Sequence, residues 1–446
     1  MNIGFVSLGC PKNRVDTEIM MASLKYAGHR IVNSMENADA VIINTCGFIT
    51  SAQEEAIDKI IETGKRKEKG QLKYLIAAGC LSQKYGSELL AEMPELDGAI
   101  GISFISSLPD VLERVAKGEK VVLTGPPPDV FVEKGPRLLT TPPGSAYLKI
   151  SEGCNNRCSY CSIPSIRGNL RSRPLEELVQ EAEILTNSGV KELVIIGQDT
   201  AAYGQDLYGQ SYLTELVKKI SNIKGLKWIR LMYLHPAHID EQLINIIAAE
   251  PKIVPYLDIP IQHASNRILK LMNRKHEIAE LKRLVAELRS RLKGLVLRTT
   301  VMVGFPGESE DDFSALYDFV GETQFDWLGS FTYSAQEGTA AATMIQEIPE
   351  HIKKERNDQI LRLQQKISRK KNIARINTSE KILISSRLSK NLYAGRGYYQ
   401  APEVDGITLV KIRSGSKLPR GEFVDVHLIG VRNYDMIGEL IDESAK

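Results

Sequence analysis

GCNNRCSYCSIP, from Gly153 to Pro164, places three cysteines at spacings of four and three residues. Three thiolates alone do not complete a tetrahedral zinc site, which takes four protein ligands or three ligands and a water. They can hold three irons of a 4Fe-4S cluster, whose fourth iron then has no thiolate. The polar residues between the cysteines argue against a core strand with buried thiols. The stretch therefore predicts an iron-sulfur site at Cys154, Cys158 and Cys161 whose open iron is available for chemistry.

The same stretch resembles the CxxxCxxC motif of radical S-adenosylmethionine enzymes, and within that superfamily it is similar to the motif of the methylthiotransferases. The resemblance implies that the open iron binds the amino and carboxylate groups of S-adenosylmethionine. It also implies that Tyr160, the aromatic residue before the last cysteine, lies near the adenine. Beyond the cluster ligands, we assign no catalytic side chain.

Length and composition limit the remaining possibilities. The 446 residues are enough for two or three domains, and 57 basic against 55 acidic residues give no general polycation for binding nucleic acid. No run of about 18 apolar residues suggests a membrane span. Met1 to Leu8 has no basic region before its apolar residues, so we expect no signal peptide and a cytoplasmic protein. There, the six cysteines are better explained as metal ligands than as disulfides.

Three short apolar runs in the N-terminal region each end just before a cysteine. The runs are Ile3 to Leu8, Ala40 to Asn44 and Tyr74 to Ala78, with helical patterns at Asp16 to Gly28 and Ala52 to Lys65. Continuous apolar runs suit parallel strands buried on both faces, which predicts a doubly wound parallel sheet. Ligands gather at the carboxyl ends of such strands. We therefore expect a second three-cysteine site at Cys10, Cys46 and Cys80; unrelated buried thiols are the alternative.

Resemblance supports this second site. SLGCPKNRVDTE, from Ser7 to Glu18, and NTCGF, from Asn44 to Phe48, are similar to the N-terminal domain of methylthiotransferases. In that family three such cysteines hold an auxiliary 4Fe-4S cluster. Thr17 stands where serine is more frequent.

A proline-rich stretch from about Lys117 to Ser145 predicts an extended connector and a domain boundary. After it, a strand and helix pattern repeats six times. The expected strands are Tyr147 to Ile150, Glu192 to Ile196, Trp228 to Leu234, Val254 to Ile261, Leu295 to Val303 and Trp327 to Tyr333. Six units are too few for a closed eight-stranded barrel, so we predict an open, partial (β/α)6 barrel with its chemistry at the carboxyl ends of the strands.

Polar residues follow several of these strands, among them Gln198, Asp199, His235, Gln262, His263 and the turn GFPGE from Gly304 to Glu308. Each could be a hydrogen-bonded structural residue or could contact a ligand. GFPGE lacks the Lys-Ser/Thr pair of a phosphate loop. Arg298 lies within a strand, where a buried arginine needs an anionic partner. In the resembled family these loops line the S-adenosylmethionine pocket, which favours Gln262 and Arg298 as cofactor-binding residues.

The sequence pattern of the C-terminal part differs from the strand and helix repeat before it. A basic helical segment, Pro349 to about Arg375, is either a surface for RNA or the ribosome or, more often for such segments, the solvated face of a connecting helix. Apolar segments then alternate with turns at Lys381 to Ser385, Gly406 to Ile412 and Glu422 to Ile429, which predicts a small antiparallel barrel. The barrel resembles a TRAM domain. From Arg375 onward 11 basic residues face 9 acidic ones, less than a tRNA-binding surface would be expected to carry.

The predicted domains are 1–137, the N-terminal methylthiotransferase domain; 138–374, the radical S-adenosylmethionine core; and 375–446, the TRAM domain. Three stretches resemble the branch of methylthiotransferases that modifies a ribosomal protein, the RimO type: GCPKNRVD from Gly9, GQDTAAYG from Gly197 and APEVDG from Ala401. That resemblance implies two 4Fe-4S clusters and S-adenosyl-L-methionine as cofactors. It also implies methylthiolation of an aspartate β-carbon in ribosomal protein S-twelve, with a reduced flavodoxin or ferredoxin as electron donor.

Two alternatives stay open. The first is a methylthiotransferase that acts on a modified adenosine in tRNA, which the weak charge of the C-terminal barrel makes less favoured. The second is a non-enzymatic iron-sulfur sensor or RNA-binding regulator, which does not explain why both cysteine sites lack a fourth ligand.

Overall fold

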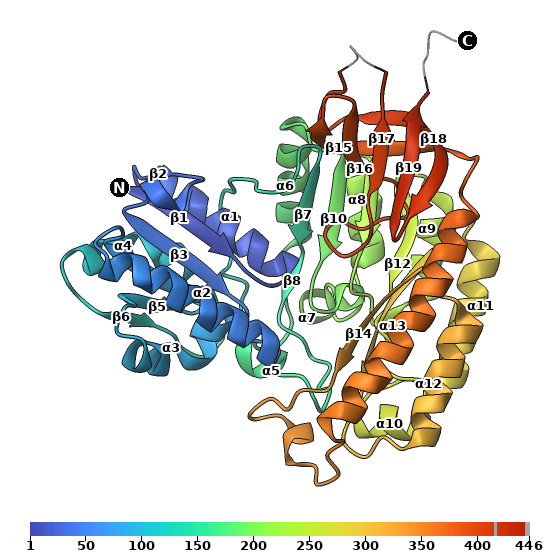
Figure 1. Ribbon diagram of the computed structural model, residues 1–446, viewed down its shortest axis with the longest axis horizontal. Coiled ribbons are helices and arrows are strands. Elements are labelled where there is room, and N and C mark those ends of the chain that lie inside the picture. Colours follow the sequence, from blue (N-terminus) through green and yellow to red (C-terminus); the bar gives the residue numbers. More distant parts are fainter. Residues whose placement is uncertain (414–416, 442–446) are drawn as a thin grey trace. The chain divides into compact units, whose positions relative to one another are not determined.

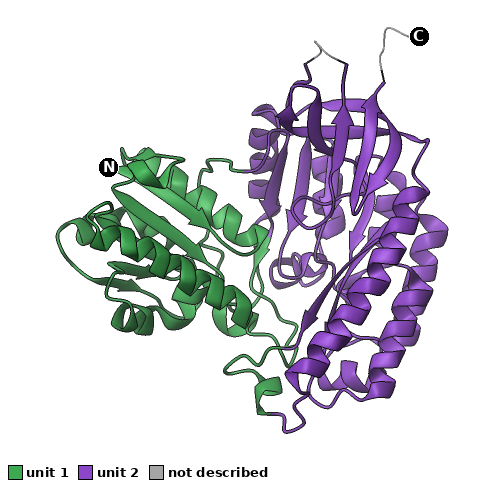
Figure 2. Cartoon of the chain, in the orientation of Figure 1, with its two compact units in different colours: residues 1–140, 151–173, 334–343 green, residues 141–150, 174–333, 344–446 purple. Residues whose placement is uncertain are grey.

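The computed structural model describes the chain except for residues 414–416 and 442–446. Its contacts divide the chain into two compact units (Figure 2). Unit 1 contains 1–140, 151–173 and 334–343, and unit 2 contains 141–150, 174–333 and the chain from residue 344 on. The segment 151–173, here called the motif loop, carries the GCNNRCSYCSIP stretch. It therefore folds together with the N-terminal region, although it directly follows the first strand of the sheet in unit 2.

Unit 1 is built on a six-stranded parallel sheet with the order β2-β1-β3-β4-β5-β6 (Figure 1). The strands are β1 (Asn2–Ser7), β2 (Arg30–Ile31), β3 (Ala40–Thr45), β4 (Tyr74–Gly79), β5 (Gly98–Ile100) and β6 (Val121–Leu123). Every residue of the central strand β3 is buried, so both faces of the sheet are covered. The strand order reverses between β1 and β3. The predicted doubly wound parallel sheet is confirmed.

Several helices of unit 1 begin within a few residues of a cysteine in the chain. They are α1 (Pro11–Tyr26), α2 (Thr50–Glu68), α3 (Cys80–Glu92), α4 (Leu108–Ala116) and the short α5 (Ile163–Ile166), with 3-10 turns at η1 (Met35–Asn37), η2 (Ile102–Ser107) and η5 (Ala340–Thr343). The sequence predicted that the first helix starts at Asp16, but it starts at Pro11. Proline suits this position, because its fixed φ matches a helix and its missing N–H is not needed in the first turn. An apolar core lies between β3, β4 and the helices α2 and α3, with Val41, Ile60 and Leu75 at its centre.

Unit 2 contains a second parallel sheet, in the order β14-β13-β12-β11-β10-β7. Its strands are β7 (Ser145–Lys149), β10 (Glu192–Ile196), β11 (Trp228–Leu231), β12 (Ile253–Asp258), β13 (Val296–Val303) and β14 (Trp327–Thr332). Six parallel strands in chain order confirm the predicted open (β/α)6 arrangement. The helices between them are α6 (Leu175–Asn187), α7 (Gln205–Tyr208), α8 (Leu213–Ser221), α9 (Glu241–Ala249), α10 (Asn266–Leu271), α11 (Ile278–Arg291) and α12 (Glu310–Thr323), with 3-10 turns at η3 (Thr200–Ala202) and η4 (Pro236–His238).

The long helix α13 (Glu350–Ile373) leads from this sheet to the C-terminal barrel. Most of its basic side chains are exposed, but Lys353 and Arg356 are buried. Arg356 pairs with Glu308 at 2.7 Å and with Glu310 at 3.0 Å. Arg356 therefore helps to fix the helix to the rest of unit 2, and neither cation is part of a solvated face. No helix in the described part of the chain has the length and apolar character that a membrane crossing requires.

The C-terminal region forms a closed five-stranded barrel, as predicted. Its strands are β15 (Ser379–Ser389), β16 (Leu392–Arg396), β17 (Thr408–Lys411), β18 (Phe423–Arg432) and β19 (Asp435–Leu440). Four neighbouring pairs are antiparallel, whereas β17 and β19 pair in parallel. The sequence pattern did not predict β16 and β19, or the parallel pair.

The barrel is fixed to the sheet of unit 2 by buried charges. Glu192 on β10 is fully buried and accepts hydrogen bonds from Arg230 on β11 at 2.9 Å and from Arg396 on β16 at 2.5 Å. Burial alone would raise the pKa of Glu192, but the charges of Arg396 and Arg230 lower it to about 2. The barrel and the sheet thus share one ion network within unit 2.

Candidate functional site

The cysteines of the N-terminal region, Cys10, Cys46 and Cys80, are here called the first trio. Cys10 caps the start of α1, Cys46 follows β3 and Cys80 is the first residue of α3. The strands β1, β3 and β4 are neighbours in the sheet, so their carboxyl ends lie at one edge. At Gly9 an added Cβ would lie only 2.7 Å from the Cβ of Cys46, which shows how closely these strand ends approach one another.

The electrostatics of the first trio suit a bound cationic group. Burial, and then the neighbouring thiol of Cys10, raise the pKa of Cys46. Burial likewise raises the pKa of Cys80 to about 12, although the charge of Arg167 acts in the opposite direction. Thiols that are buried together ionise only when a cation compensates them, and a metal cluster does this while it displaces their protons. The first trio therefore fits a three-thiolate iron-sulfur site.

Sequence reasoning missed two residues beside the first trio. Asn13 donates hydrogen bonds to the carbonyls of Leu8 at 3.2 Å and Thr45 at 2.9 Å, which ties together the chain segments that follow β1 and β3. Arg167 comes from the motif loop, is buried, and donates a hydrogen bond to the sulfur of Cys80 at 3.2 Å. No local sequence signal indicates this contact, because 87 residues separate its partners.

The second trio, Cys154, Cys158 and Cys161, lies in the motif loop, and its three residues are partly exposed. The loop is closed across its base by a hydrogen bond from the amide of Cys154 to the carbonyl of Gly168 at 3.1 Å. The amide of Asn156 donates to the sulfur of Cys154 at 3.4 Å. Gly153 has a φ of +75° and no room for a Cβ, which would lie 2.0 Å from the carbonyl oxygen of Asn169. The loop is thus folded to hold its cysteines in place.

Both trios are placed in unit 1, together with a late segment of the chain, 334–343. Gln336 in this segment is buried and accepts a hydrogen bond from Gln53 at 2.9 Å. Gln53 also donates to the carbonyl of Gly47, next to Cys46. At the other end of the segment, the amide of Ala341 donates to the carbonyl of Ser159 in the motif loop at 2.8 Å. The segment 334–343 therefore contacts the chain around both trios.

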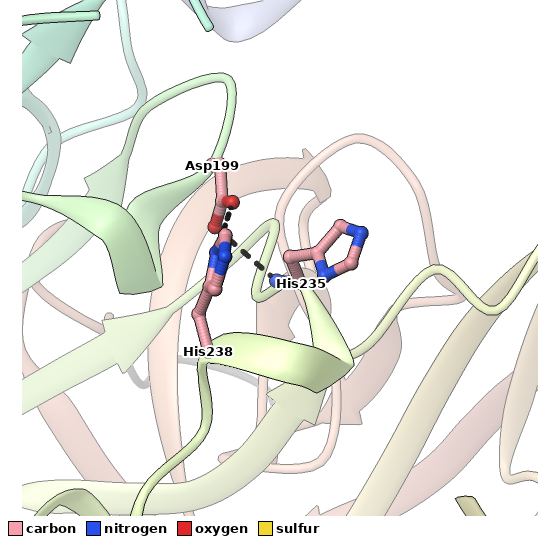
Figure 3. A group of neighbouring side chains, drawn as sticks. All are labelled: Asp199, His235 and His238. Atoms are coloured by element: carbon pink, nitrogen blue, oxygen red, sulfur yellow. Dashed lines mark hydrogen bonds and ion pairs between the residues drawn. The ribbon is translucent and has the colours of Figure 1, made fainter. Parts of the chain in front are cut away.

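Polar residues lie after the strands of unit 2, as the sequence predicted. Figure 3 shows the ring of His238 facing the carboxylate of Asp199, and the distance from Nδ1 to Oδ2 is 2.6 Å. The other carboxylate oxygen accepts from the amide of His235 at 3.4 Å, and Nδ1 of His235 accepts from the amide of Ala237 at 3.2 Å. The ligand atoms of Asp199, His235 and His238 lie within 4.8 Å of one another, close enough for a metal ion. A metal there would compete with hydrogen bonds that already use both carboxylate oxygens and Nδ1 of each histidine.

Gln262 and His263 follow β12. Gln262 is partly exposed, has a φ of +69°, and its backbone bonds to Thr300 at 2.9 Å and Met302 at 2.8 Å. His263 is fully buried: its Nδ1 accepts from the amide of Ser265, and its Nε2 lies 3.3 Å from Glu308 of the GFPGE turn. His263 therefore has partners within unit 2, and both possibilities stated for it stay open. The role of Gln262 in binding the cofactor stays a prediction.

Arg298 is near the amino end of β13. Its predicted anionic partner is present: the guanidinium lies 2.9 Å from Asp258 and 3.5 Å from Asp405. Asp405 belongs to the APEVDG stretch and also accepts from the hydroxyl of Tyr256 at 2.7 Å. Arg298 and Asp405 line a cavity of about 540 Å³ together with Trp327 and residues of the barrel. A contact of Arg298 with the cofactor stays a prediction, and its visible role is to join the sheet to the barrel.

Comparison with known proteins identifies the parts of the chain. Residues 148–320 match the radical SAM superfamily, residues 378–441 match the TRAM domain, and residues 2–101 match the Uncharacterized protein family UPF0004. Among solved structures, the radical S-adenosylmethionine methyltransferase TsrM from Kitasatospora setae is similar with a TM-score of 0.54 at 14% identity, covering 76% of this chain and 77% of that one. This likeness supports the fold alone.

Curated relatives match over the whole length. The ribosomal protein uS12 methylthiotransferase RimO of Syntrophomonas wolfei is 63% identical over 439 residues, which cover 98% of this chain and all of the relative. The protein of the same description from Pelotomaculum thermopropionicum is 48% identical over 99% of both chains. Together with both cysteine trios, the six-stranded core and the barrel, these matches show that the chain belongs to the RimO family of radical S-adenosylmethionine methylthiotransferases.

Proposed function

We propose that this protein attaches a methylthio group to ribosomal protein uS12, the S-twelve protein of the small subunit, at the β-carbon of an aspartate. The curated relatives carry this protein substrate in their names. The observation that carries the proposal is that two three-cysteine sites belong to one compact unit, within a chain of the RimO family. The reaction needs both a radical and a sulfur donor, so two such sites are what it requires.

The two cysteine trios are the residues that would hold the iron-sulfur clusters. Cys154, Cys158 and Cys161 would bind one 4Fe-4S cluster, and the first trio would bind the other. When bound, these clusters supply reductive cleavage of S-adenosylmethionine and a place from which sulfur is transferred. The chain itself keeps the motif loop closed through the Cys154 to Gly168 hydrogen bond. It also keeps Cys46 and Cys80 of the first trio buried, which limits the access of water to the reacting groups.

Substrate positioning falls to the strand ends of unit 2. We assign cofactor contacts to Tyr160 and Gln262, and we retain Arg298 as a third candidate. The paired Asp199 and His238 lie where the carboxyl ends of parallel strands present ligand contacts. We place the protein in the cytoplasm, where the ribosome is, and we expect a reduced flavodoxin or ferredoxin to supply the electrons.

One experiment separates the protein substrate from tRNA. In a strain that lacks the gene, mass spectrometry of uS12 should show the aspartate without its methylthio group, about 46 Da lighter, while the methylthio-adenosines of tRNA are unchanged. Re-expression of the natural chain should restore the mark. Loss of the mark from tRNA with intact modification of uS12 would overturn the proposal. A chain that yields no 5'-deoxyadenosine from S-adenosylmethionine under reducing, anaerobic conditions would favour the non-enzymatic sensor.

A further inference from the structure

Arg167 connects the motif loop to the first trio. Its guanidinium is buried in unit 1 and donates from one nitrogen to the sulfur of Cys80 at 3.2 Å and to the side-chain oxygen of Asn13 at 2.6 Å. Asn13 in turn binds the backbone after β1 and β3. Arg167 therefore donates both to the sulfur of Cys80 and to Asn13. The bonds of Asn13 reach the backbone close to Cys10 and Cys46, the other two cysteines of the first trio.

Two carboxylates lie beside Arg167. The guanidinium lies 2.7 Å from the carboxylate of Glu152 and 3.5 Å from that of Asp16, and both carboxylates are buried. Ionised cysteines of the first trio would add further negative charge. Arg167 thus offsets negative charge in a medium of low dielectric constant, where repulsion between anions is strong.

Arg167 is also part of the motif loop's own fold. The next residue, Gly168, accepts the hydrogen bond that closes the loop at Cys154, and the carbonyl of Arg167 accepts from Arg171 at 2.7 Å. Ile166, on its other side, packs with Cys80 and Ile102 in an apolar cluster. A single short stretch thus touches the loop that carries the second trio and a ligand of the first.

We propose that Arg167 is a positioning residue for the auxiliary cluster, one that holds the first trio against the motif loop and raises the cluster's reduction potential. This inference rests on the proposed function, because it takes the first trio to hold a 4Fe-4S cluster. A hydrogen bond to a ligating sulfur and a nearby positive charge both stabilise the more negative, reduced cluster. Replacing Arg167 should therefore make the auxiliary cluster harder to reduce.

The test uses the full chain with Cys154, Cys158 and Cys161 replaced by alanine, so that only the auxiliary cluster can assemble. In this background, R167M removes the charge and the donor, and R167K keeps the charge but shortens the side chain. The matched control is R137M, because Arg137 is similarly buried and pairs with Glu18 at 2.6 Å, a pair that includes no cysteine. Iron and sulfide per chain are measured after anaerobic reconstitution, and the midpoint potential is measured by a redox titration followed by electron paramagnetic resonance.

We expect R167M to lower the equilibrium constant for one-electron reduction at least tenfold, which is a shift of about 59 mV to more negative potential. R167K should shift it in the same direction by less, and R137M should leave it unchanged. Loss of iron from both Arg167 variants, with normal circular dichroism and normal iron in R137M, would also support the positioning role. The inference fails if R167M keeps its iron and has the potential of the parent. If the parent itself assembles no cluster, the proposed function fails at the first trio, and this inference fails with it.

Discussion

Replacing Glu192 by glutamine tests how firmly the C-terminal barrel is held on the central sheet. The substitution keeps the size of the side chain and removes its charge. It leaves Arg230 and Arg396 buried without the carboxylate that both now contact, at 2.9 Å and 2.5 Å. The carboxylate also accepts from the hydroxyl of Ser145 at 3.0 Å, so the single amide oxygen of glutamine must replace two oxygens that now serve three side chains.

The size of the effect follows from the pKa of Glu192. That pKa is about 2 in the folded protein against an ordinary value of 4.5. At about 1.4 kcal/mol per pKa unit, the difference corresponds to about 3 kcal/mol of stability at neutral pH. Removing one partner of a buried ion pair costs a similar amount, about 3–5 kcal/mol. Because the folded-state pKa is lowered, this stability is present in full above pH 4.5 and is lost as the pH falls toward 2.

The two tryptophans of the chain make the barrel contact visible by fluorescence. Trp228 stacks edge to face on Phe423 of β18 at 4.5 Å between ring centroids, and the indole N–H of Trp327 donates to the carbonyl of Tyr399 at 2.7 Å. In a urea titration under anaerobic conditions, the fluorescence transition of E192Q should move to lower urea by about 1 M or more, given a slope of about 1–3 kcal/mol per M.

The matched control is E422Q. Glu422 pairs with Lys191 at 3.1 Å and so also joins the barrel to the sheet, but both side chains are partly exposed. Such a surface pair contributes about 0–1 kcal/mol, so E422Q should barely move the transition. If E192Q and E422Q unfold at the same urea concentration, the buried network does not hold the barrel, and the reasoning is refuted.

Three further predictions concern both units. C46A should still cleave S-adenosylmethionine to 5'-deoxyadenosine but transfer no sulfur; full methylthiolation of uS12 by this variant, measured by mass spectrometry, would remove the role of the first trio. Burial raises the pKa of Asp405 to about 6 from 3.8 against the pull of Arg298, so this carboxyl destabilises the fold as the pH rises through 6. D405N should abolish that part of the pH dependence of the urea midpoint between pH 4 and 7. Q336A removes the bond to Gln53 and should speed amide hydrogen exchange in 334–343, and unchanged exchange would contradict the contact.

The sequence predicted the strands β1, β3 and β4 of unit 1 and all six strands of the sheet in unit 2, because buried parallel strands appear as continuous apolar runs. It missed the short strands β2, β5 and β6 of unit 1. Glu192–Ile196 was predicted at its observed bounds, and the other five strands of the core differ at their ends. The short strands β16 and β19 of the barrel were missed, because Leu392–Arg396 and Asp435–Leu440 mix small, polar and apolar residues without a clear alternation.

Contacts between distant residues could not be predicted in the same way. The need of Arg298 for an anionic partner was predicted and is confirmed, but nothing local identifies Asp258 or Asp405 as that partner. Glu192 and Arg396 are 204 residues apart. Arg356 belongs to a basic run that looks solvated, yet it is buried against Glu308. Each of these pairings depends on which strands and helices become neighbours, which periodicity alone does not specify.

Unit 1 is assembled from segments that are far apart in the chain, and this sets the order in which its parts are synthesised. As the chain leaves the ribosome, 87 residues separate the last cysteine of the first trio from Arg167. At about 5–20 residues per second, this interval lasts roughly 4–17 s, and the segment 334–343 emerges later still. The first trio is therefore synthesised before Arg167, the donor to the sulfur of Cys80, and before 334–343, so the fold around the trio is completed only when these later segments join unit 1.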